Sequence, residues 1–188
     1  MGSIVGISGN LTRPSRTRVL VEEVLRQAEA RGLGSTLSYD IIDAGPELGA
    51  ATERANLPHP VDRVLSAIEG ADALVVASPV FKASYTGLFK HLFDLIDPKA
   101  LEGRPVILAA TGGSDRHALV IEHHLRPLFA FFRAHVVPTG LEPANADSPA
   151  EGTLAEPMRA RIGPALDQLE WALRPVPRAP RDGALRVA

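Results

Sequence analysis

The sequence predicts an α/β fold in three layers, with one five-stranded parallel sheet in the order 2-1-3-4-5 and helices on both faces. Three observations lead to this fold class. Short apolar runs alternate with amphipathic stretches along the whole chain. The short runs are apolar on both sides, as in strands covered on both faces. Five of them fit into about 140 residues, which suits this order better than a six-stranded dinucleotide-binding sheet.

The first third of the chain predicts two strands, a helix and a loop. Ser3–Ser8 is short and rich in β-branched residues, so it predicts a strand rather than a helix. Between Thr17 and Ala30 the apolar residues fall on one helical face, and Gly32 ends that helix. Thr36–Ile42 predicts the second strand. Residues 43–60 hold three prolines and two glycines without a clean period, which predicts a long loop.

The rest of the chain continues the alternation. Each further helix shows an apolar stripe, and each further strand is a short apolar run. The Asp97-Pro98 pair ends one of these helices. The predicted elements are a helix over 61–70, a strand over 73–78, a helix over 88–96, a strand over 105–111, a helix over 118–132, a strand over 135–140 and a helix over 158–173.

This order of elements is typical of the flavodoxin-like fold. Because no internal repeat or second domain is visible, we expect a single domain over residues 1–174. Residues 175–188 are rich in proline and arginine and have little to bury, which predicts a disordered tail.

Composition excludes several classes of function. A formal net charge of -2 and a pI near 6.3 show no overall excess of positive charge. We therefore expect neither nucleic acid nor an anionic membrane as a partner. The absence of cysteine removes disulfides, thiolate metal sites and cysteine nucleophiles. The N-terminus lacks the features of a signal peptide, and no apolar run approaches the roughly 20 residues of a membrane helix. We therefore expect a soluble, cytoplasmic protein.

The predicted fold places the site. Ligands of such sheets bind beyond the carboxyl ends of the strands, where the strand order reverses. Three loops meet there, over residues 8–16, 78–85 and 111–116, and all are rich in small polar residues. Such loops suit a ligand held by backbone N–H groups and hydroxyls. The first loop and the helix after it supply the candidates Ser8, Asn10, Arg13, Ser15, Arg16 and Thr17.

The first loop predicts an anion site. It leads into a helix, whose free N–H groups and dipole favour an anion. Arg13 and Arg16 add guanidinium forks that fit phosphate oxygens. A structural role is equally compatible with these residues, since Ser15 or Thr17 can cap the helix and the arginines can lie on the solvated surface. Which of the two arginines lies closer to the anion is left open.

Better-known motifs are missing from these loops. There is no Walker lysine and no G-x-G-x-x-G fingerprint, so nucleotide hydrolysis is disfavoured, and Asp40 and Asp43 are interpreted as ordinary loop aspartates. The G-x-S-x-G elbow of a serine hydrolase is also absent. His123 and His124 are adjacent and point to different helix faces, so we expect no metal site. His117 is the histidine best placed to meet a ligand.

A mononucleotide with a flat ring, such as flavin mononucleotide (FMN), fits these loops. Its phosphate would lie on the first loop, and its ring against the second and third. Phe81 and Tyr85 are the only aromatic residues of the second loop. Such sparse stacking predicts loose binding with one face of the ring open, where a nicotinamide would lie for hydride transfer.

Three segments carry a family resemblance: SGNLTRPSRT from Ser8, SPVFKASYTGLFKHLFDLI from Ser78 and ATGG from Ala110. In this order and spacing they resemble the NAD(P)H-dependent FMN reductases, especially the branch that supplies reduced flavin to two-component monooxygenases of alkanesulfonates, methanesulfonate and related sulfur compounds. The likeness runs from about Ser3 to Leu141.

The resemblance implies a flavodoxin-like fold, a homodimer or homotetramer, and FMN bound as a substrate or exchangeable cofactor with NADPH or NADH as the reductant. Some sulfonate-type members carry an inserted tyrosine in a π-bulge of the fourth helix. This chain has His123 at that place, so a tyrosine cannot stack across the interface, and whether His123 lies in such a bulge is left open. The implied phosphate contacts are Ser8, Ser15, Arg16 and Thr17, and the implied ring contacts are Pro79, Val80, Phe81, Lys82, Thr111, Gly112 and Gly113.

We therefore expect an NAD(P)H-dependent FMN reductase that serves a flavin-dependent monooxygenase. Hydride transfer between the cofactors needs no acid–base residue, so no catalytic residue is assigned. Backbone N–H groups of residues 111–113 would meet the charge on the reduced flavin, with support from Lys82 and His117 left open. Two alternatives remain: a flavoenzyme that retains FMN and reduces quinones, azo dyes or metal oxyanions, and a non-enzymatic electron carrier.

Overall fold

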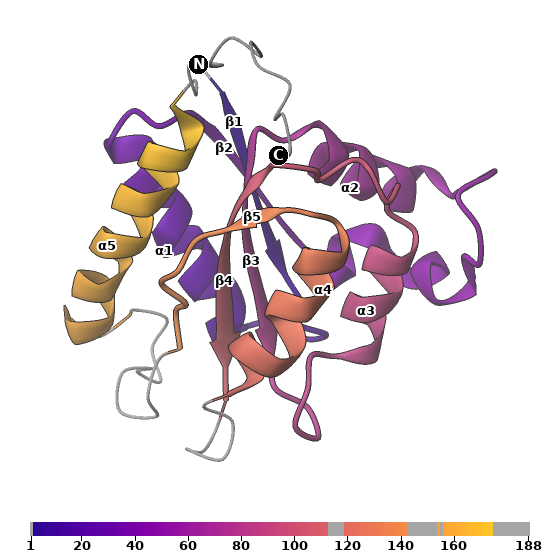
Figure 1. Ribbon diagram of the computed structural model, residues 1–188. Helices are drawn as coiled ribbons and strands as arrows, with labels where there is room; N and C mark the ends of the chain where they lie inside the picture. The colour runs from indigo at the N-terminus through magenta and orange to yellow at the C-terminus, as the bar shows by residue number, and fades with distance from the viewer. Residues whose placement is uncertain (1, 113–118, 143–153, 155, 175–188) are drawn as a thin grey trace, which may run out of the picture.

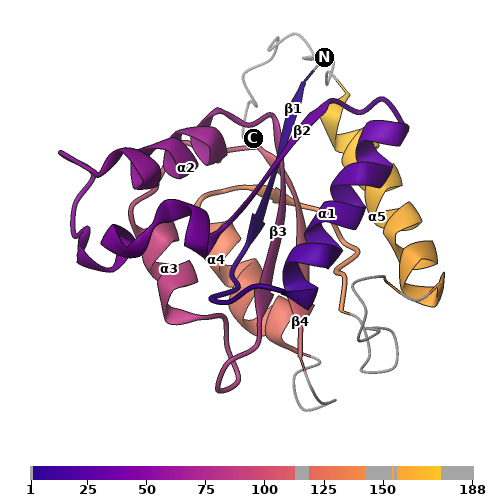
Figure 2. The ribbon, with the colours of Figure 1, turned by 180° about the vertical axis from the view of Figure 1, so that it is seen from behind.

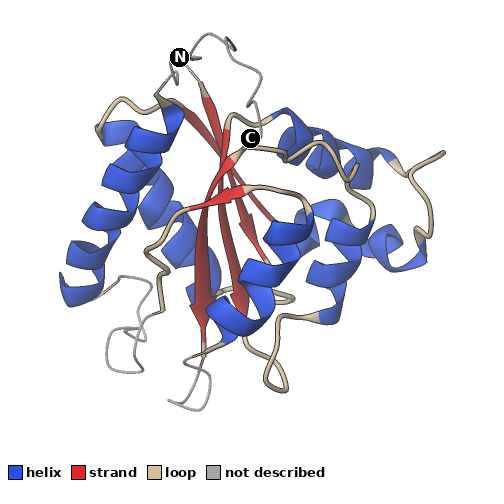
Figure 3. Cartoon of the chain, in the orientation of Figure 1, coloured by secondary structure: helices blue, strands red, loops and turns tan. Residues whose placement is uncertain are grey.

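Five strands pair in parallel to form the central sheet, in the predicted order β2-β1-β3-β4-β5 (Figure 1). The structure is a computed structural model and describes residues 2–112, 119–142, 154 and 156–174. The carboxyl ends of β1, β3 and β4 lie at one end of the sheet (Figure 3). The strands are β1 (Ser3–Ser8), β2 (Ser35–Asp40), β3 (Ala73–Pro79), β4 (Pro105–Thr111) and β5 (His135–Val136).

Helices cover both faces of this sheet, as expected for the flavodoxin-like fold (Figures 1 and 2). Because side chains of a strand alternate between its two faces, β3 sends Val75 into one apolar core and Leu74 into the other. The first core holds α1 and α5, and the second holds α2, α3 and α4. These helices are α1 (Arg16–Ala30), α2 (His59–Gly70), α3 (Gly87–Asp94), α4 (Arg126–Phe131) and α5 (Glu156–Leu173).

A glycine in β1 brings α1 onto the sheet. A Cβ atom at Gly6 would lie 2.5 Å from Val21 Cγ1 and 2.6 Å from Leu25 Cδ1, both on α1. The helix therefore packs directly against the strand backbone. This close packing fixes the first turn of α1 beside the carboxyl end of β1, where the predicted anion site lies.

The residues after β2 differ from the expectation. The strand ends at Asp40 rather than Ile42, because the Asp40 side chain caps a short 3₁₀ helix, Ile41–Ala44. A second 3₁₀ helix spans Pro46–Ala50, and α2 begins at His59. Much of the predicted loop over 43–60 is thus helical turn. Proline and glycine concealed these turns, because both residue types also mark irregular loops.

The last strand and the fourth helix also differ in detail. β5 has two residues instead of the predicted 135–140, and Leu141 adds only an isolated bridge to Ala109. A π-helix, Ile121–Leu125, precedes α4 and contains His123, which answers the question that the sequence left open. The predicted tail lies outside the described residues. None of the helices in the described part of the chain combines the length and the apolar character needed to cross a bilayer.

We predict that Gly6→Ala lowers the free energy of unfolding by about 1–3 kcal/mol, because the added methyl group overpacks a closed core. Urea denaturation of both proteins measures this difference. Gly70→Ala is the matched control, since a Cβ there meets no atom within 4 Å. Equal stability of Gly6→Ala and the wild type would show that α1 can move away from the sheet at little cost.

Candidate functional site

A cavity of about 430 Å³ lies at the carboxyl ends of β1, β3 and β4. This volume is within the usual range of small-ligand sites. No carboxylate lines the described wall of the cavity, and Arg16 is the one charged residue in it. The wall is formed by Asn10, Leu11, Thr12, Pro14, Ser15, Arg16, Thr17, Pro79, Val80, Phe81, Thr111 and Gly112.

Buried polar groups tie the first two loops together beneath this cavity. The Thr86 hydroxyl donates to the Gly9 carbonyl oxygen at 2.9 Å, and the Gly9 N–H donates to the Ala77 carbonyl oxygen at 2.8 Å. A Cβ atom at Gly9 would lie 2.9 Å from Ser78 Oγ, so a glycine is needed at this close approach. The loop after β1 is therefore held against β3 and the segment that follows it by hydrogen bonds to the main chain of Gly9.

The third loop is joined to α1 by two hydroxyls. Thr17 Oγ1 and Thr111 Oγ1 lie 2.6 Å apart, which makes a hydrogen bond between the first turn of α1 and the end of β4. Thr17 is buried, while Thr111 is partly exposed in the cavity wall. The three loops of the site are thus linked to one another.

The first turn of α1 faces the cavity with its N-terminus. Ser15 is the N-cap, and its hydroxyl accepts from the Arg18 N–H at 3.3 Å. The Ser15 hydroxyl thus satisfies the N–H group of Arg18. The N–H groups of Arg16 and Thr17 belong to the same first turn, where N–H groups have no partner within the helix. Ser15 thus both caps the helix and lines the cavity.

The two candidate arginines of the first loop lie in different places. Arg13 donates to both oxygens of Asp40, at 2.7 and 2.8 Å, and to Asp43 at 2.7 Å. Arg13 is therefore paired with these carboxylates and is not part of the described cavity wall. Arg16 lines the cavity and forms no ion pair with another described residue. Of the two, Arg16 is the arginine available to an anion.

Asp40 is the acidic partner that sequence reasoning misjudged. It is not an ordinary loop aspartate, because its side chain is fully buried at the end of β2. Arg18 donates to Asp40 at 2.8 Å, and Asn10 donates to it at 3.1 Å. Burial raises the pKa of the Asp40 carboxyl, but the hydrogen bonds from Arg13, Arg18 and Asn10 outweigh burial and hold the pKa well below its usual range.

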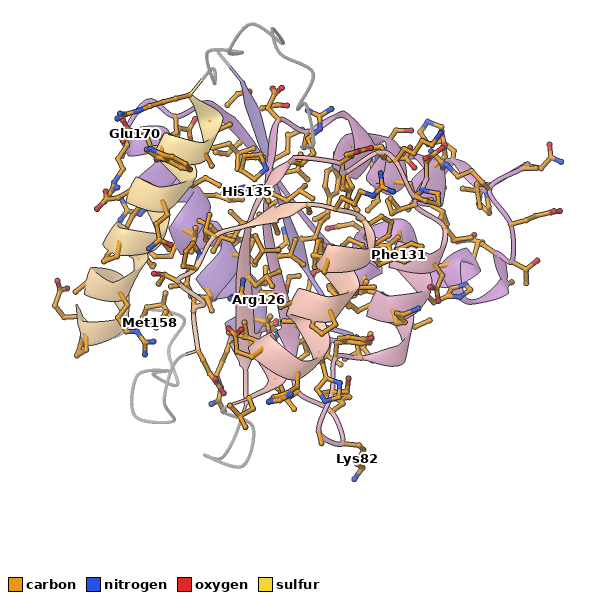
Figure 4. All side chains as sticks on the ribbon, in the orientation of Figure 1. Lys82, Arg126, Phe131, His135, Met158 and Glu170 are labelled. Atoms are coloured by element: carbon orange, nitrogen blue, oxygen red, sulfur yellow. The ribbon has the colours of Figure 1, made fainter. Side chains whose placement is uncertain are left out.

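The second loop turns through a tight hairpin. The Phe81 N–H donates to the Ser84 carbonyl oxygen at 2.8 Å, and the return bond is 3.2 Å. Lys82 and Ala83 have φ values of 52° and 71°, as the two central residues of a type I′ turn have. Figure 4 shows the Lys82 side chain pointing away from the molecule. Lys82, an expected ring contact, therefore does not line the described cavity wall. Phe81 lines the cavity and is 53% exposed.

Tyr85 also lies outside the cavity wall. Its ring packs 5.6 Å from that of Phe89 and meets the His124 ring edge-on at 6.3 Å. His124 Nδ1 lies 3.2 Å from Ser84 Oγ. The π-helix thus contacts the hairpin through His124, which meets Ser84 and Tyr85. Tyr85 is part of this contact and does not face the cavity.

The cavity brings together nine of the predicted binding residues: Asn10, Ser15, Arg16, Thr17, Pro79, Val80, Phe81, Thr111 and Gly112. Ser8 is not among them, because it is buried beneath the loop and donates to Asn10 Oδ1 at 2.5 Å. Gly113 and His117 lie outside the described residues. Sequence reasoning missed Leu11, Thr12 and Pro14, although each lies between predicted residues of the same loop.

The arrangement combines two kinds of surface. The first loop offers hydroxyls, a helix N-terminus and the Arg16 guanidinium, which pairs with no carboxylate of the described residues, and these groups suit a phosphate. The second loop offers Pro79, Val80 and Phe81, which suit a flat apolar group. In the described part of the chain, no three histidine or acidic side chains gather in a way that could hold a metal ion.

Comparisons with known proteins agree with this chemistry. A family model described as NADPH-dependent FMN reductase matches residues 3–146. The NADH-dependent FMN reductase SfnF of Pseudomonas fluorescens is 48% identical over 159 residues, 85% of each chain. An FMN reductase (NADPH) of Pseudomonas aeruginosa is 47% identical over 164 residues, 85% of this chain and 86% of the relative. The apo crystal structure of the NADH:FMN oxidoreductase EMOB has a TM-score of 0.83 at 30% identity, over 94% of this chain and 92% of that chain.

The Asp40 contacts predict how stability depends on pH. A carboxyl whose pKa is lower in the folded state contributes stability above its unfolded pKa of about 3.9, and this contribution is lost as the pH falls below that value. We expect the free energy of unfolding to drop more steeply between pH 5 and pH 3 in the wild type than in Asp40→Asn. At pH 7 the variant loses about 2–3 kcal/mol, less than a fully buried pair would, because both arginines reach solvent.

Urea unfolding of the two proteins at several pH values measures this difference. Other carboxyls, such as Glu23, whose pKa Arg26 lowers to about 2, contribute equally to both proteins. Parallel pH profiles would contradict a strongly paired Asp40.

Proposed function

Because the chain belongs to the NADPH-dependent FMN reductase family, we propose that it supplies reduced FMN to a flavin-dependent monooxygenase of organosulfur metabolism, one that acts on an alkanesulfonate, methanesulfonate or a sulfone. The family makes the chain an oxidoreductase that uses NAD(P)H and FMN. The role in sulfur metabolism is supported by the resemblance of the loop segments to that branch and by the similarity to reductases named SfnF and SfnE.

The observation that carries this proposal is Arg16, which forms no ion pair with another described residue and lines a cavity whose described wall holds no carboxylate. Such a wall fits FMN, whose phosphate needs cationic and hydroxyl donors and whose ring needs an apolar surface. Ser15, Arg16 and Thr17 would hold the phosphate. Pro79–Phe81 and Thr111–Gly112 would hold the ring. FMN, when bound, supplies the acceptor for the hydride of a reduced nicotinamide.

The chain's own residues would position the two reactants. Leu11 and Phe81 both line the cavity and are 37% and 53% exposed, so the cavity has an apolar rim that reaches solvent. A nicotinamide ring would pack at this rim against the flavin. The N–H of Gly112 at the end of β4 would lie beside the ring, where a fixed backbone dipole stabilises developing negative charge. Lys82 is not needed for this step.

The coenzyme and the fate of FMN need direct measurement. Two relatives of almost equal identity carry NADH in one name and NADPH in the other. Turnover of each nicotinamide with FMN, FAD and riboflavin tests both questions. Saturable consumption of free FMN supports the proposal. A tightly held flavin with quinone-dependent or azo-dye-dependent turnover supports the FMN-retaining alternative, and no oxidation with excess FMN leaves only an electron carrier.

The link to a monooxygenase has its own test. The reductase is mixed with a flavin-dependent alkanesulfonate monooxygenase as the sole source of reduced FMN, and the release of sulfite is measured. Sulfite release that depends on this chain supports the link. Rapid FMN reduction would contradict it if no monooxygenase formed product, which is sulfite from a sulfonate and a sulfinate from a sulfone.

We also expect a homodimer or homotetramer in the cytoplasm. Leu119 lies just before the π-helix Ile121–Leu125, and Phe131 is the last residue of α4. Their side chains are 61% and 68% exposed, and exposed apolar side chains of this size favour association. Phe131 is labelled in Figure 4. Light scattering after gel filtration gives the mass in solution, and a monomer at micromolar concentration would contradict this expectation.

We predict that Arg16→Ala raises the KM for FMN about tenfold or more and leaves the KM for riboflavin unchanged, because riboflavin lacks the phosphate. A charge-assisted hydrogen bond contributes about 1.5–3 kcal/mol, and about 1.4 kcal/mol corresponds to a factor of ten. Arg54→Ala is the control, since Arg54 pairs with Asp62 and Glu69 away from the cavity. An equal change for both flavins would remove Arg16 from the phosphate site.

A further inference from the structure

One carboxylate organises the loop that lines the phosphate side of the cavity. Asp40 Oδ1 and Oδ2 together accept four hydrogen bonds from side chains, two from Arg13 and one each from Arg18 and Asn10. Oδ1 also accepts from the backbone N–H groups of Ile42 and Asp43, at 3.0 and 3.2 Å. A buried carboxylate with this number of donors is fixed in position.

The side-chain donors to Asp40 come from the loop after β1 and from the first turn of α1. Asn10 and Arg13 flank the turn after β1, and Arg18 lies in the first turn of α1. Within the described chain, residues 11–14 make no main-chain hydrogen bond to another main-chain atom. Asn10 Nδ2 donates to both the Thr12 carbonyl oxygen, at 3.0 Å, and Asp40. The conformation of this turn therefore depends on its side-chain bonds to Asp40.

Asp40 also determines which arginine is available. Residues 13–18 contain three arginines, and the first and last of them, Arg13 and Arg18, donate to Asp40. Hydrogen bonds to Asp40 and then to Asp43 raise the pKa of Arg13, which shows how closely its charge is paired. Arg16 is left to face the cavity. The positions of the loop N–H groups and of Arg16 thus both follow from one residue beneath the cavity.

We propose that Asp40 is a positioning residue for flavin phosphate recognition: it touches no ligand, but it holds the turn over residues 10–18 in the shape that receives the phosphate. The inference rests on the proposed function, since it concerns the same cavity. It adds a residue of β2, a strand that contributes no residue to the described cavity wall.

Asp40→Asn separates positioning from simple electrostatics. Removal of a negative charge near the site would, by charge alone, tighten the binding of a phosphate. Loss of the turn's shape would weaken it. We expect the dissociation constant for FMN, measured by quenching of flavin fluorescence without nicotinamide, to rise about tenfold, and that for riboflavin to stay within about twofold. Tighter or unchanged FMN binding would overturn the inference, and so would equal weakening for both flavins.

Two further variants remove one carboxylate each and keep the comparison falsifiable if Asp40→Asn does not fold. Asp43 contacts Arg13 and the Asp40 N–H and is partly exposed, so Asp43→Asn tests the same cluster with less risk to folding. We expect it to weaken FMN binding about threefold. Glu22→Gln is the matched control, because Glu22 pairs with Arg18 from the solvent side. Weakening by Glu22→Gln as large as by Asp43→Asn would contradict the inference.

The wild type distinguishes this inference from the proposed function. If the wild type neither oxidises NAD(P)H with FMN nor binds FMN more tightly than riboflavin, the proposed function fails. If the wild type does both and the preference for FMN over riboflavin survives in Asp40→Asn and Asp43→Asn, only the role of Asp40 fails.

Discussion

The buried negative charge of Asp40 is the constraint around which the candidate site is arranged. A carboxylate taken out of water must be paired and hydrogen-bonded, and the donors that satisfy Asp40 come from the loop after β1 and the first turn of α1. Those elements therefore cannot adopt their conformations independently of β2. The same pairing leaves a single charged side chain, Arg16, in the described wall of the cavity.

Buried apolar and buried polar side chains occupy different parts of the molecule. The two apolar cores on the faces of the sheet hold the helices in place, and Gly6 lets α1 approach closely enough to carry its N-terminus to the cavity. The buried polar side chains of the described residues all lie at or near the carboxyl edge of the sheet, beneath the loops. They are Ser8, Asn10, Thr17, Asp40, Ser78 and Thr86. Stability and recognition thus depend on different parts of the fold.

The sequence predicted the sheet order and most of the cavity wall for physical reasons. Strand and helix periods are local, and the carboxyl edge of a parallel sheet is the expected place for a ligand. The difference between Arg13 and Arg16 was not predictable, because it depends on Asp40, which lies 27 residues from Arg13. Burial of an aspartate leaves no local pattern. The outward direction of Lys82 was missed because its type I′ turn contains no glycine or asparagine, the usual sign of such a turn.

A crystal structure of the wild type with FMN bound tests the central claim most directly. The phosphate is predicted to contact Arg16 and the first turn of α1, while Arg13 and Arg18 keep their hydrogen bonds to Asp40. A phosphate held by Arg13, with the Arg13–Asp40 pair broken, would contradict the claim that a buried carboxylate fixes the phosphate site.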